Sequence, residues 1–194
     1  MKTTLLVMMF TLMGVFNGFG QSQKNDLKLT VAALPLIGSS DDFESGVNGF
    51  VIKPSAGYFI TDKTSVDLNF SYATLNDLRV GNVDSYYTSY AFTPTLRNNF
   101  VNKSKLRVFA EFGVGLGTIQ YDADNSNLRT SQHEALSGGI SILNIGFGGN
   151  YFFNDHFGIE LIIPYLNTRN ITSKETNTLY SGIGPTLGFT YMIR

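Results

Sequence analysis

The side chains that could support catalysis gather around His133, one of two histidines in the chain. Ser131, Glu134 and Ser137 lie close to it in the sequence. A histidine oriented by an acid can take the proton of a serine hydroxyl, so these residues could hydrolyse a lipid at a membrane surface. Three common polar residue types in one polar segment are weak evidence for such a site. His156 stands in a short polar turn. We therefore expect no catalytic residues, and a lipid-modifying enzyme is the least favoured alternative.

Metal, cofactor and nucleic-acid sites have even less support. Asp122, Asp124 and Ser126 have the alternating spacing of a calcium loop, but the required glycine and the twelfth-position acid are missing. The glycines of 146–149 lie inside a strand pattern, which favours packing over nucleotide binding. The chain has no cysteine, and its formal net charge of -1 offers no attraction for nucleic acid. We expect no metal, no cofactor and no nucleic-acid partner.

The first twenty residues have the features of a cleavable export signal. Lys2 provides the positive start, the run from Leu5 to Phe16 is apolar, and Gly18 and Gly20 are small residues before a cleavage point. We expect a signal peptide over 1–20 and one β-barrel domain over 21–194. No later stretch reaches eighteen continuous apolar residues, so no spanning helix is expected in the mature chain.

Apolar and polar residues alternate through the rest of the sequence, as Val66-Asp67-Leu68-Asn69-Phe70-Ser71-Tyr72 shows. Such a period of two is typical of β-strands with two different faces. Strands this long exceed the five or six residues usual in soluble sheets and suit tilted membrane strands. The alternation predicts eight strands, over 27–37, 49–60, 65–75, 86–98, 105–119, 138–153, 157–169 and 179–193.

The connections between these strands alternate between long and short. The long ones are 38–48, 76–85, 120–137 and 170–178. Outer-membrane barrels have this asymmetry, with short periplasmic turns and long external loops. The sequence therefore predicts an all-β fold, an eight-stranded antiparallel up-and-down transmembrane β-barrel, located in the outer membrane with these four loops outside.

Two observations favour an apolar face that meets lipid instead of a soluble core. Tyrosine and phenylalanine concentrate near the strand ends, as aromatic girdles at the headgroup level do; examples are Tyr58, Phe59, Tyr87, Tyr151 and Phe152. The other face is rich in glycine, serine, threonine and asparagine, which fit a narrow interior. A soluble, lipocalin-like carrier of about this size remains an alternative.

Two local patterns resemble the small outer-membrane β-barrels of Gram-negative bacteria, the OmpA-like and OmpX-like group. Val108-Phe109-Ala110-Glu111-Phe112-Gly113-Val114-Gly115-Leu116-Gly117 is similar to the group's glycine-spaced strand with one inward acid. Tyr58-Phe59-Ile60-Thr61-Asp62-Lys63-Thr64 resembles its passage from strand to turn. The resemblance covers the mature chain and implies an architecture, without indicating a particular activity.

The alternation places several charged residues on the interior face. If the apolar rows meet lipid, we expect three basic and three acidic side chains to form a compensating network that plugs the lumen: Lys53, Asp67, Arg97, Arg107, Glu111 and Glu160. We therefore expect a monomeric scaffold, surrounded by outer-membrane lipid, that presents its external loops to a surface partner. The alternative from the same fold is a conduit for a small solute or an apolar molecule.

Overall fold

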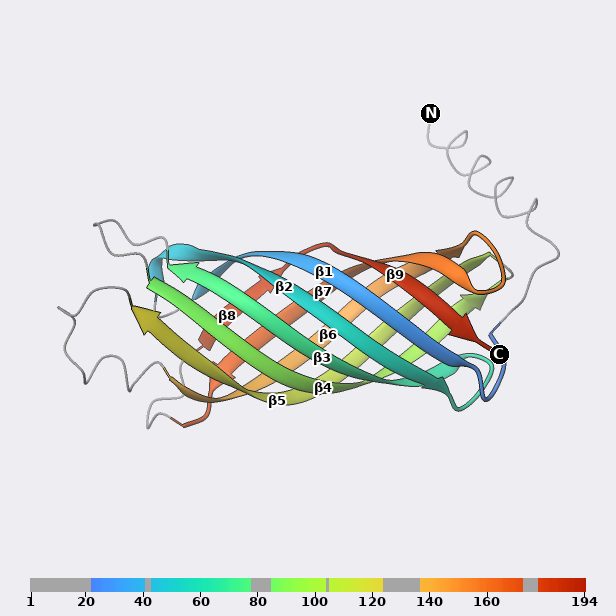
Figure 1. The fold of residues 1–194 in the computed structure, drawn as a ribbon, viewed down its shortest axis with the longest axis horizontal. Coiled ribbons are helices and arrows are strands. Elements are labelled where there is room, and N and C mark those ends of the chain that lie inside the picture. Colours follow the sequence, from blue (N-terminus) through green and yellow to red (C-terminus); the bar gives the residue numbers. More distant parts are fainter. Residues whose placement is uncertain (1–21, 41–42, 78–84, 104, 124–136, 173–177) are drawn as a thin grey trace, which may run out of the picture.

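The chain folds into a closed antiparallel β-barrel (Figure 1). The computed structural model describes residues 22–40, 43–77, 85–103, 105–123, 137–172 and 178–194, so the expected export signal over 1–20 lies outside the described residues. In the described part, no helix is long and apolar enough to cross a membrane. The strands are β1 (Leu27–Ser40), β2 (Phe43–Phe59), β3 (Thr64–Asp77), β4 (Ser85–Asn102), β5 (Leu106–Ala123), β6 (Gly138–Phe152), β7 (Phe157–Asn170), β8 (Thr178–Ile183) and β9 (Thr186–Ile193).

Nine numbered strands occupy eight positions around the barrel. β8 and β9 follow each other along one position, because both pair with β7 on one side and with β1 on the other. Gly184 and Pro185 separate them, and proline has no N–H to offer a ladder. The β1–β2 and β1–β9 ladders close the ring. The predicted eight-stranded up-and-down barrel is confirmed.

The clearest difference from the expected strand limits is at 38–48. This segment is not a long loop: β1 runs to Ser40 and β2 starts at Phe43, and the ladder pairs Gly38 with Val47. Its glycines and polar residues have low strand propensity, but pairing with the adjacent strand outweighs that propensity. The strands also extend into the other three expected loops, of which 78–84, 124–136 and 173–177 lie outside the described residues.

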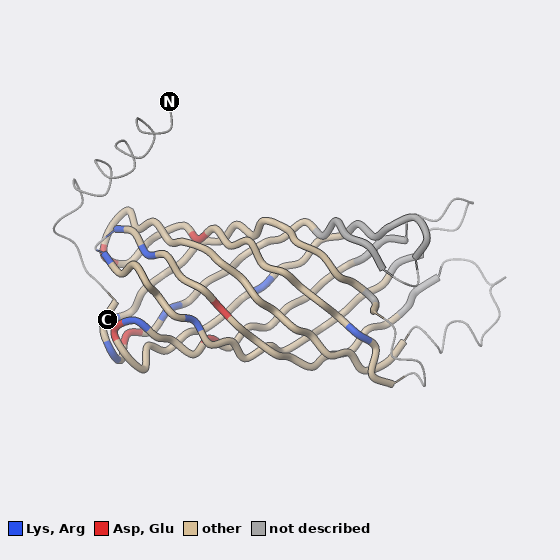
Figure 2. Tube along the Cα trace, turned by 180° about the vertical axis from the view of Figure 1, so that it is seen from behind, with Lys and Arg blue, Asp and Glu red and all other residues tan. Residues whose placement is uncertain are grey.

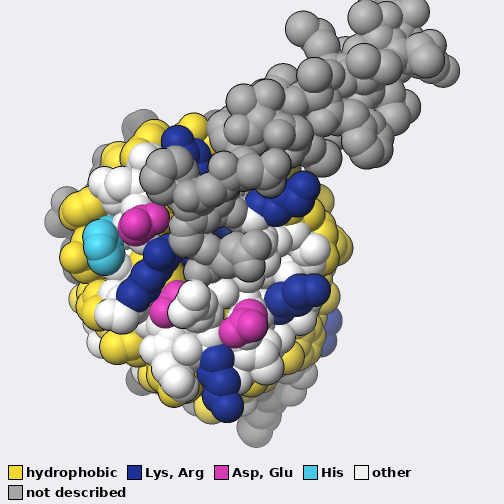
Figure 3. Space-filling view, turned by 90° about the vertical axis from the view of Figure 1, so that its right-hand side faces the viewer, with side chains coloured by type: hydrophobic (Ala, Val, Ile, Leu, Met, Phe, Trp, Pro, Cys, Tyr) yellow, Lys and Arg dark blue, Asp and Glu magenta, His cyan; other side chains and the backbone are white. Residues whose placement is uncertain are grey.

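The outward face is an apolar belt. Val114, Leu116 and Phe189 are 57%, 65% and 73% exposed. On the other strands, large apolar side chains are likewise exposed at alternate positions. Figure 3 shows hydrophobic side chains around the rim of the end that holds both described termini. A closed barrel with such a surface requires hydrocarbon around it, which excludes the soluble carrier and places the chain in an outer membrane.

The two ends of the barrel differ. The short connections that follow β2, β4 and β6 lie at the end with the described termini, which is the periplasmic end by the usual asymmetry of these barrels. Figure 2 shows that Lys, Arg, Asp and Glu of the described chain concentrate toward this end. Among the aromatics expected in girdles, Tyr58 and Tyr151 are exposed, whereas the neighbouring Phe59 and Phe152 are buried inside because alternation turns them inward.

Candidate functional site: a buried ion cluster across the lumen

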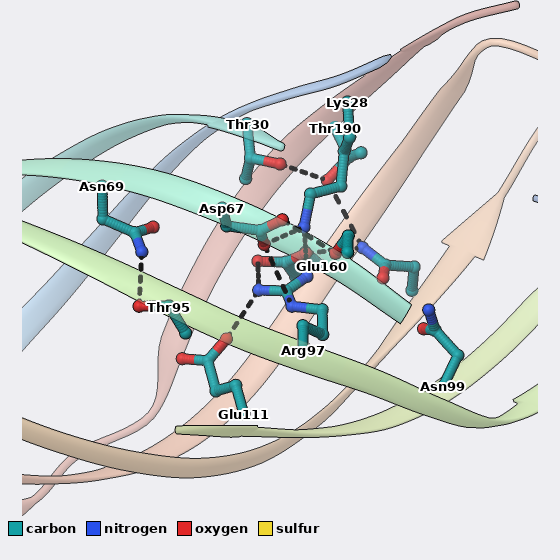
Figure 4. Close-up of polar contacts among 12 residues, drawn as sticks. Lys28, Thr30, Asp67, Asn69, Thr95, Arg97, Asn99, Glu111, Glu160 and Thr190 are labelled. Atoms are coloured by element: carbon teal, nitrogen blue, oxygen red, sulfur yellow. Dashed lines mark hydrogen bonds and ion pairs between the residues drawn. The ribbon is translucent and has the colours of Figure 1, made fainter. Parts of the chain in front are cut away.

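Arg97 is the centre of a group of ion pairs inside the barrel (Figure 4). It stands opposite Glu111 in the β4–β5 ladder, and its Nη2 donates to Glu111 Oε2 at 2.7 Å. Its Nη1 donates to Glu160 Oε2 at 2.5 Å, and its Nε lies 3.3 Å from Asp67 Oδ2. One guanidinium therefore joins carboxylates from β5, β7 and β3.

Two lysines complete the group. Lys28 on β1 donates from Nζ to Asp67 Oδ2 at 2.6 Å and lies 3.9 Å from Glu160 Oε2. Lys53 on β2 places its Nζ 3.9 Å from Glu111 Oε1. We call these six residues the ion cluster: Lys28, Lys53, Asp67, Arg97, Glu111 and Glu160. It draws on β1, β2, β3, β4, β5 and β7, and its three cations balance its three anions.

Uncharged side chains donate further hydrogen bonds to the carboxylate oxygens of the ion cluster. Ser65 Oγ donates to Asp67 Oδ1 at 2.8 Å, Asn144 Nδ2 donates to Glu111 Oε1 at 2.9 Å, and Asn150 Nδ2 donates to Glu160 Oε2 at 2.8 Å. The Arg97 guanidinium also lies 3.8 Å from the centre of the Phe109 ring. All of the paired carboxylates are nearly inaccessible, so their charges depend on these partners and not on water.

A glycine makes room for the cluster. A Cβ at Gly57 on β2 would overlap the Asp67 carboxylate and lie 3.1 Å from Lys28 Cε. Every residue except glycine carries that Cβ, so the close approach of the Lys28–Asp67 pair to β2 requires glycine at this position.

Of the six predicted lumen charges, the structure brings five together and separates Arg107. In the β4–β5 ladder Arg107 faces Asn102, four residues from Glu111 toward the periplasmic end, or about 13 Å at the usual rise per residue. Arg107 makes no ion pair among the described residues; it donates to Met192 Sδ at 3.4 Å and lies 4.3 Å from the Phe152 ring centre. Arg107 shares the interior face with Glu111, but it lies too far along the strand to reach the other charged residues.

Lys28 is the member that sequence reasoning missed. The signal was present, because Lys28 stands between Leu27 and Leu29 in a strand of alternating pattern and so belongs to the interior face. Its position at the very start of the strand hid it, since strand limits are the least certain part of such an interpretation. The structure gives it one of the shortest ion pairs in the interior.

Two further layers close the barrel below the ion cluster. Phe59, Phe152 and Met192 pack together and are at most 2% exposed. Below them the chain over 22–26 crosses the periplasmic end, where Ser22 Oγ donates to the Asp62 carbonyl at 3.0 Å and Tyr58 Oη donates to Asn25 Oδ1 at 2.6 Å. Polar and charged side chains gather on the visible part of this end face in Figure 3.

The weaker candidate sites find no support in the described chain. Ser131, His133, Glu134, Asp124 and Ser126 lie outside the described residues, so the expected absence of catalysis and of calcium stays a prediction. No group of three or more potential metal ligands occurs among the residues that the structure describes. His156 is exposed, with Nδ1 2.9 Å from the Met192 carbonyl, and it stacks on Tyr191.

Comparison with known proteins shows the fold. No protein-family model matches the sequence, and no curated protein matches it either. Among solved structures, the outer membrane protein OprG of Pseudomonas aeruginosa is 13% identical, with 91% of this chain and 100% of that chain covered and a TM-score of 0.50. Ail, the attachment invasion locus protein of Yersinia pestis, solved with the heparin analogue sucrose octasulfate, is 13% identical over 88% of this chain and 100% of that chain, with a TM-score of 0.50. This chain has the fold of the small outer-membrane β-barrels.

Proposed function

We propose that this outer-membrane barrel is a closed, monomeric scaffold that holds its external connections at the cell surface, with neither an open pore nor enzymatic activity. Its partners are the surrounding outer-membrane lipid and a surface molecule met by the outer connections. The observation that carries the proposal is the ion cluster, which spans the lumen and leaves Asp67, Arg97, Glu111 and Glu160 between 0% and 4% exposed.

The physical case against a pore has two parts. Eight strands enclose an interior that side chains can fill completely. The three cations and three anions of the cluster compensate each other, so no net charge remains to draw an ion through. The layer of Phe59, Phe152 and Met192 and the chain over 22–26 add two more barriers at the periplasmic end.

The expected result in planar bilayers is that the protein gives no discrete conductance steps. Arg97→Ala combined with Glu160→Ala should give brief conductance events, because the double change removes one charge of each sign and two of the side chains that block the lumen, although Phe59, Phe152 and Met192 still narrow it. Arg169→Ala on the exposed outer face is the control and should stay silent. Stable single-channel steps from the unmodified protein would refute the closed scaffold and favour the solute conduit.

The orientation of the scaffold is tested separately with inserted epitope tags. A tag between Asn125 and Ser126, in the longest connection, should bind antibody on intact cells. A tag between Asn154 and Asp155, in the turn between β6 and β7, should bind antibody only after the outer membrane is permeabilised. The reverse labelling pattern would contradict surface presentation.

A further inference from the structure

A cavity of about 80 Å³ lies inside the barrel between the ion cluster and the outer end. Its walls are mostly apolar, although the interior of an outer-membrane barrel is usually polar. The apolar wall residues come from seven strands and include Leu34, Val51, Ala73, Ile119, Ile140, Leu166 and Tyr180. Several of them belong to one buried hydrophobic cluster, which surrounds the cavity.

Polar groups at the same cavity have unused hydrogen-bonding capacity. Asn144 donates to Glu111 through Nδ2, but its Oδ1 has no hydrogen-bond partner, and neither has Oγ1 of Thr186. Both residues line the cavity and are only 3% and 2% exposed. Lys53, which also lines it, has its nearest carboxylate oxygen at 3.9 Å, beyond hydrogen-bond range. Buried polar groups without partners are costly, so this region is built for a partner that the chain itself does not supply.

We propose that this cavity binds a small uncharged molecule with an apolar body and a single hydroxyl or amide head. Such a head both donates and accepts: it can donate to Asn144 Oδ1 and accept from Thr186 or from the Lys53 ammonium. A carboxylate cannot donate, so it would leave Asn144 Oδ1 without a partner. The apolar walls contact the body of the ligand.

The size of the cavity fits this class of ligand. One water needs about 10–15 Å³ of cavity volume, so about 80 Å³ accommodates several waters or one small organic molecule. Polar residues such as Ser71, Ser89 and Thr93 also line the cavity, but most of its exposed wall surface is apolar. That surface favours the organic molecule, because a water needs two to four polar partners. Since the ion cluster closes the periplasmic side, the ligand approaches from the outer half of the barrel.

The test is a titration of the whole protein in lipid nanodiscs with benzyl alcohol, followed by NMR of isoleucine methyl groups. Ile119 and Ile140 line the cavity, whereas Ile145 and Ile163 face lipid and report alcohol dissolved in the bilayer. We expect saturable shifts at the first pair and only a linear, non-saturating drift at the second. Benzoate should give no saturable shift, and toluene should bind several-fold more weakly than benzyl alcohol because it lacks the hydroxyl.

Two variants separate head recognition from simple filling of space. Thr186→Val keeps the shape and removes Oγ1, and should weaken benzyl alcohol roughly two- to tenfold while leaving toluene unchanged. Thr190→Val is the control for removal of a buried hydroxyl on the same strand and face, since Thr190 does not line the cavity and its Oγ1 is bonded to Thr30 and Asn150. Ala73→Phe should fill the cavity and abolish saturable binding, with unchanged Ile145 and Ile163 spectra showing that the barrel is intact.

Three results would overturn the proposal. The first is the absence of saturable shifts at Ile119 and Ile140, which would mean a cavity occupied by water only. The second is equal affinity for toluene and benzyl alcohol, and the third is an unchanged benzyl alcohol affinity in Thr186→Val.

Discussion

Replacing Arg97 by glutamine should lower the free energy of unfolding by about 3–5 kcal/mol, the cost typical of breaking a buried ion pair from one side. Arg97 is the only residue of the ion cluster with ion pairs to all three acids, Asp67, Glu111 and Glu160. Glutamine keeps hydrogen-bonding capacity but removes the charge, so three carboxylates are left with two lysines. The measurement is urea unfolding of the protein refolded into lipid vesicles, followed by circular dichroism because the chain has no tryptophan.

A second change should recover part of this loss. Glu160→Gln in the Arg97→Gln background restores the balance of charge, so the double variant should be more stable than the sum of the two single losses predicts. Arg169→Gln is the control, because Arg169 is exposed and its Nε donates to Asn167. Strict additivity of Arg97→Gln and Glu160→Gln would show that the charges are solvated separately, and the closed lumen would lose its basis.

The second large effect is expected on the outer face. Val114→Arg should destabilise the membrane-inserted barrel by about 2–4 kcal/mol, the cost of an arginine near the bilayer midplane of such barrels. Val114 lies near the middle of β5, is 57% exposed, and pairs with Leu143 of β6. The same vesicle unfolding experiment measures the loss.

Gln120→Arg is the matched control for this change. Gln120 is on the same strand and the same face, six residues closer to the outer end. The cost of arginine falls to about 0–1 kcal/mol near the interface, so this variant should be close to the unmodified protein. Equal losses in Val114→Arg and Gln120→Arg would mean that the belt does not meet hydrocarbon.

Alternation was sufficient to predict the two faces of the barrel. A strand exposes every second residue to one environment, so the apolar row of Val66, Leu68 and Phe70 defines where Asp67 and Asn69 point. The same rule put Arg97 and Glu111 inside, and the short 99–104 connection put them near each other. Their direct pairing follows from the register of one tight hairpin.

Alternation could not predict how far along the barrel axis each inward residue lies. Arg107 shares a face with Glu111 but lies four residues away, and only the observed register shows that this distance breaks the contact. Lys28 reaches Asp67 of β3 over the intervening β2, and it approaches Glu160 of β7 across the closure between β1 and β9. Contacts across that closure connect residues far apart in sequence, and no local pattern encodes them.

The apolar cavity was beyond sequence reasoning for a different reason. Alternation places Ile119 on the face of Glu111 and Ile140 on the face of Asn144, but it does not show that inward apolar residues from several strands meet around a space. The assumption of a uniformly polar interior then hides them. The separation of the lumen into a charged inner half and an apolar outer half emerges only when all eight strand positions are brought together.

The break at Gly184–Pro185 gives the barrel wall a preferred place to part. Along β1, residues 27–33 pair with β9, but toward the outer end Ser39 with Ser181 is the only pair with the last strand position among the described residues. Fewer ladder pairs therefore hold this stretch than hold β1 to β9, so local opening of the wall is expected here first. It lies beside Leu34, which lines the cavity. A molecule dissolved in the bilayer could thus enter the interior laterally, through a transient opening between β1 and β8, while the other strand ladders of the barrel stay paired.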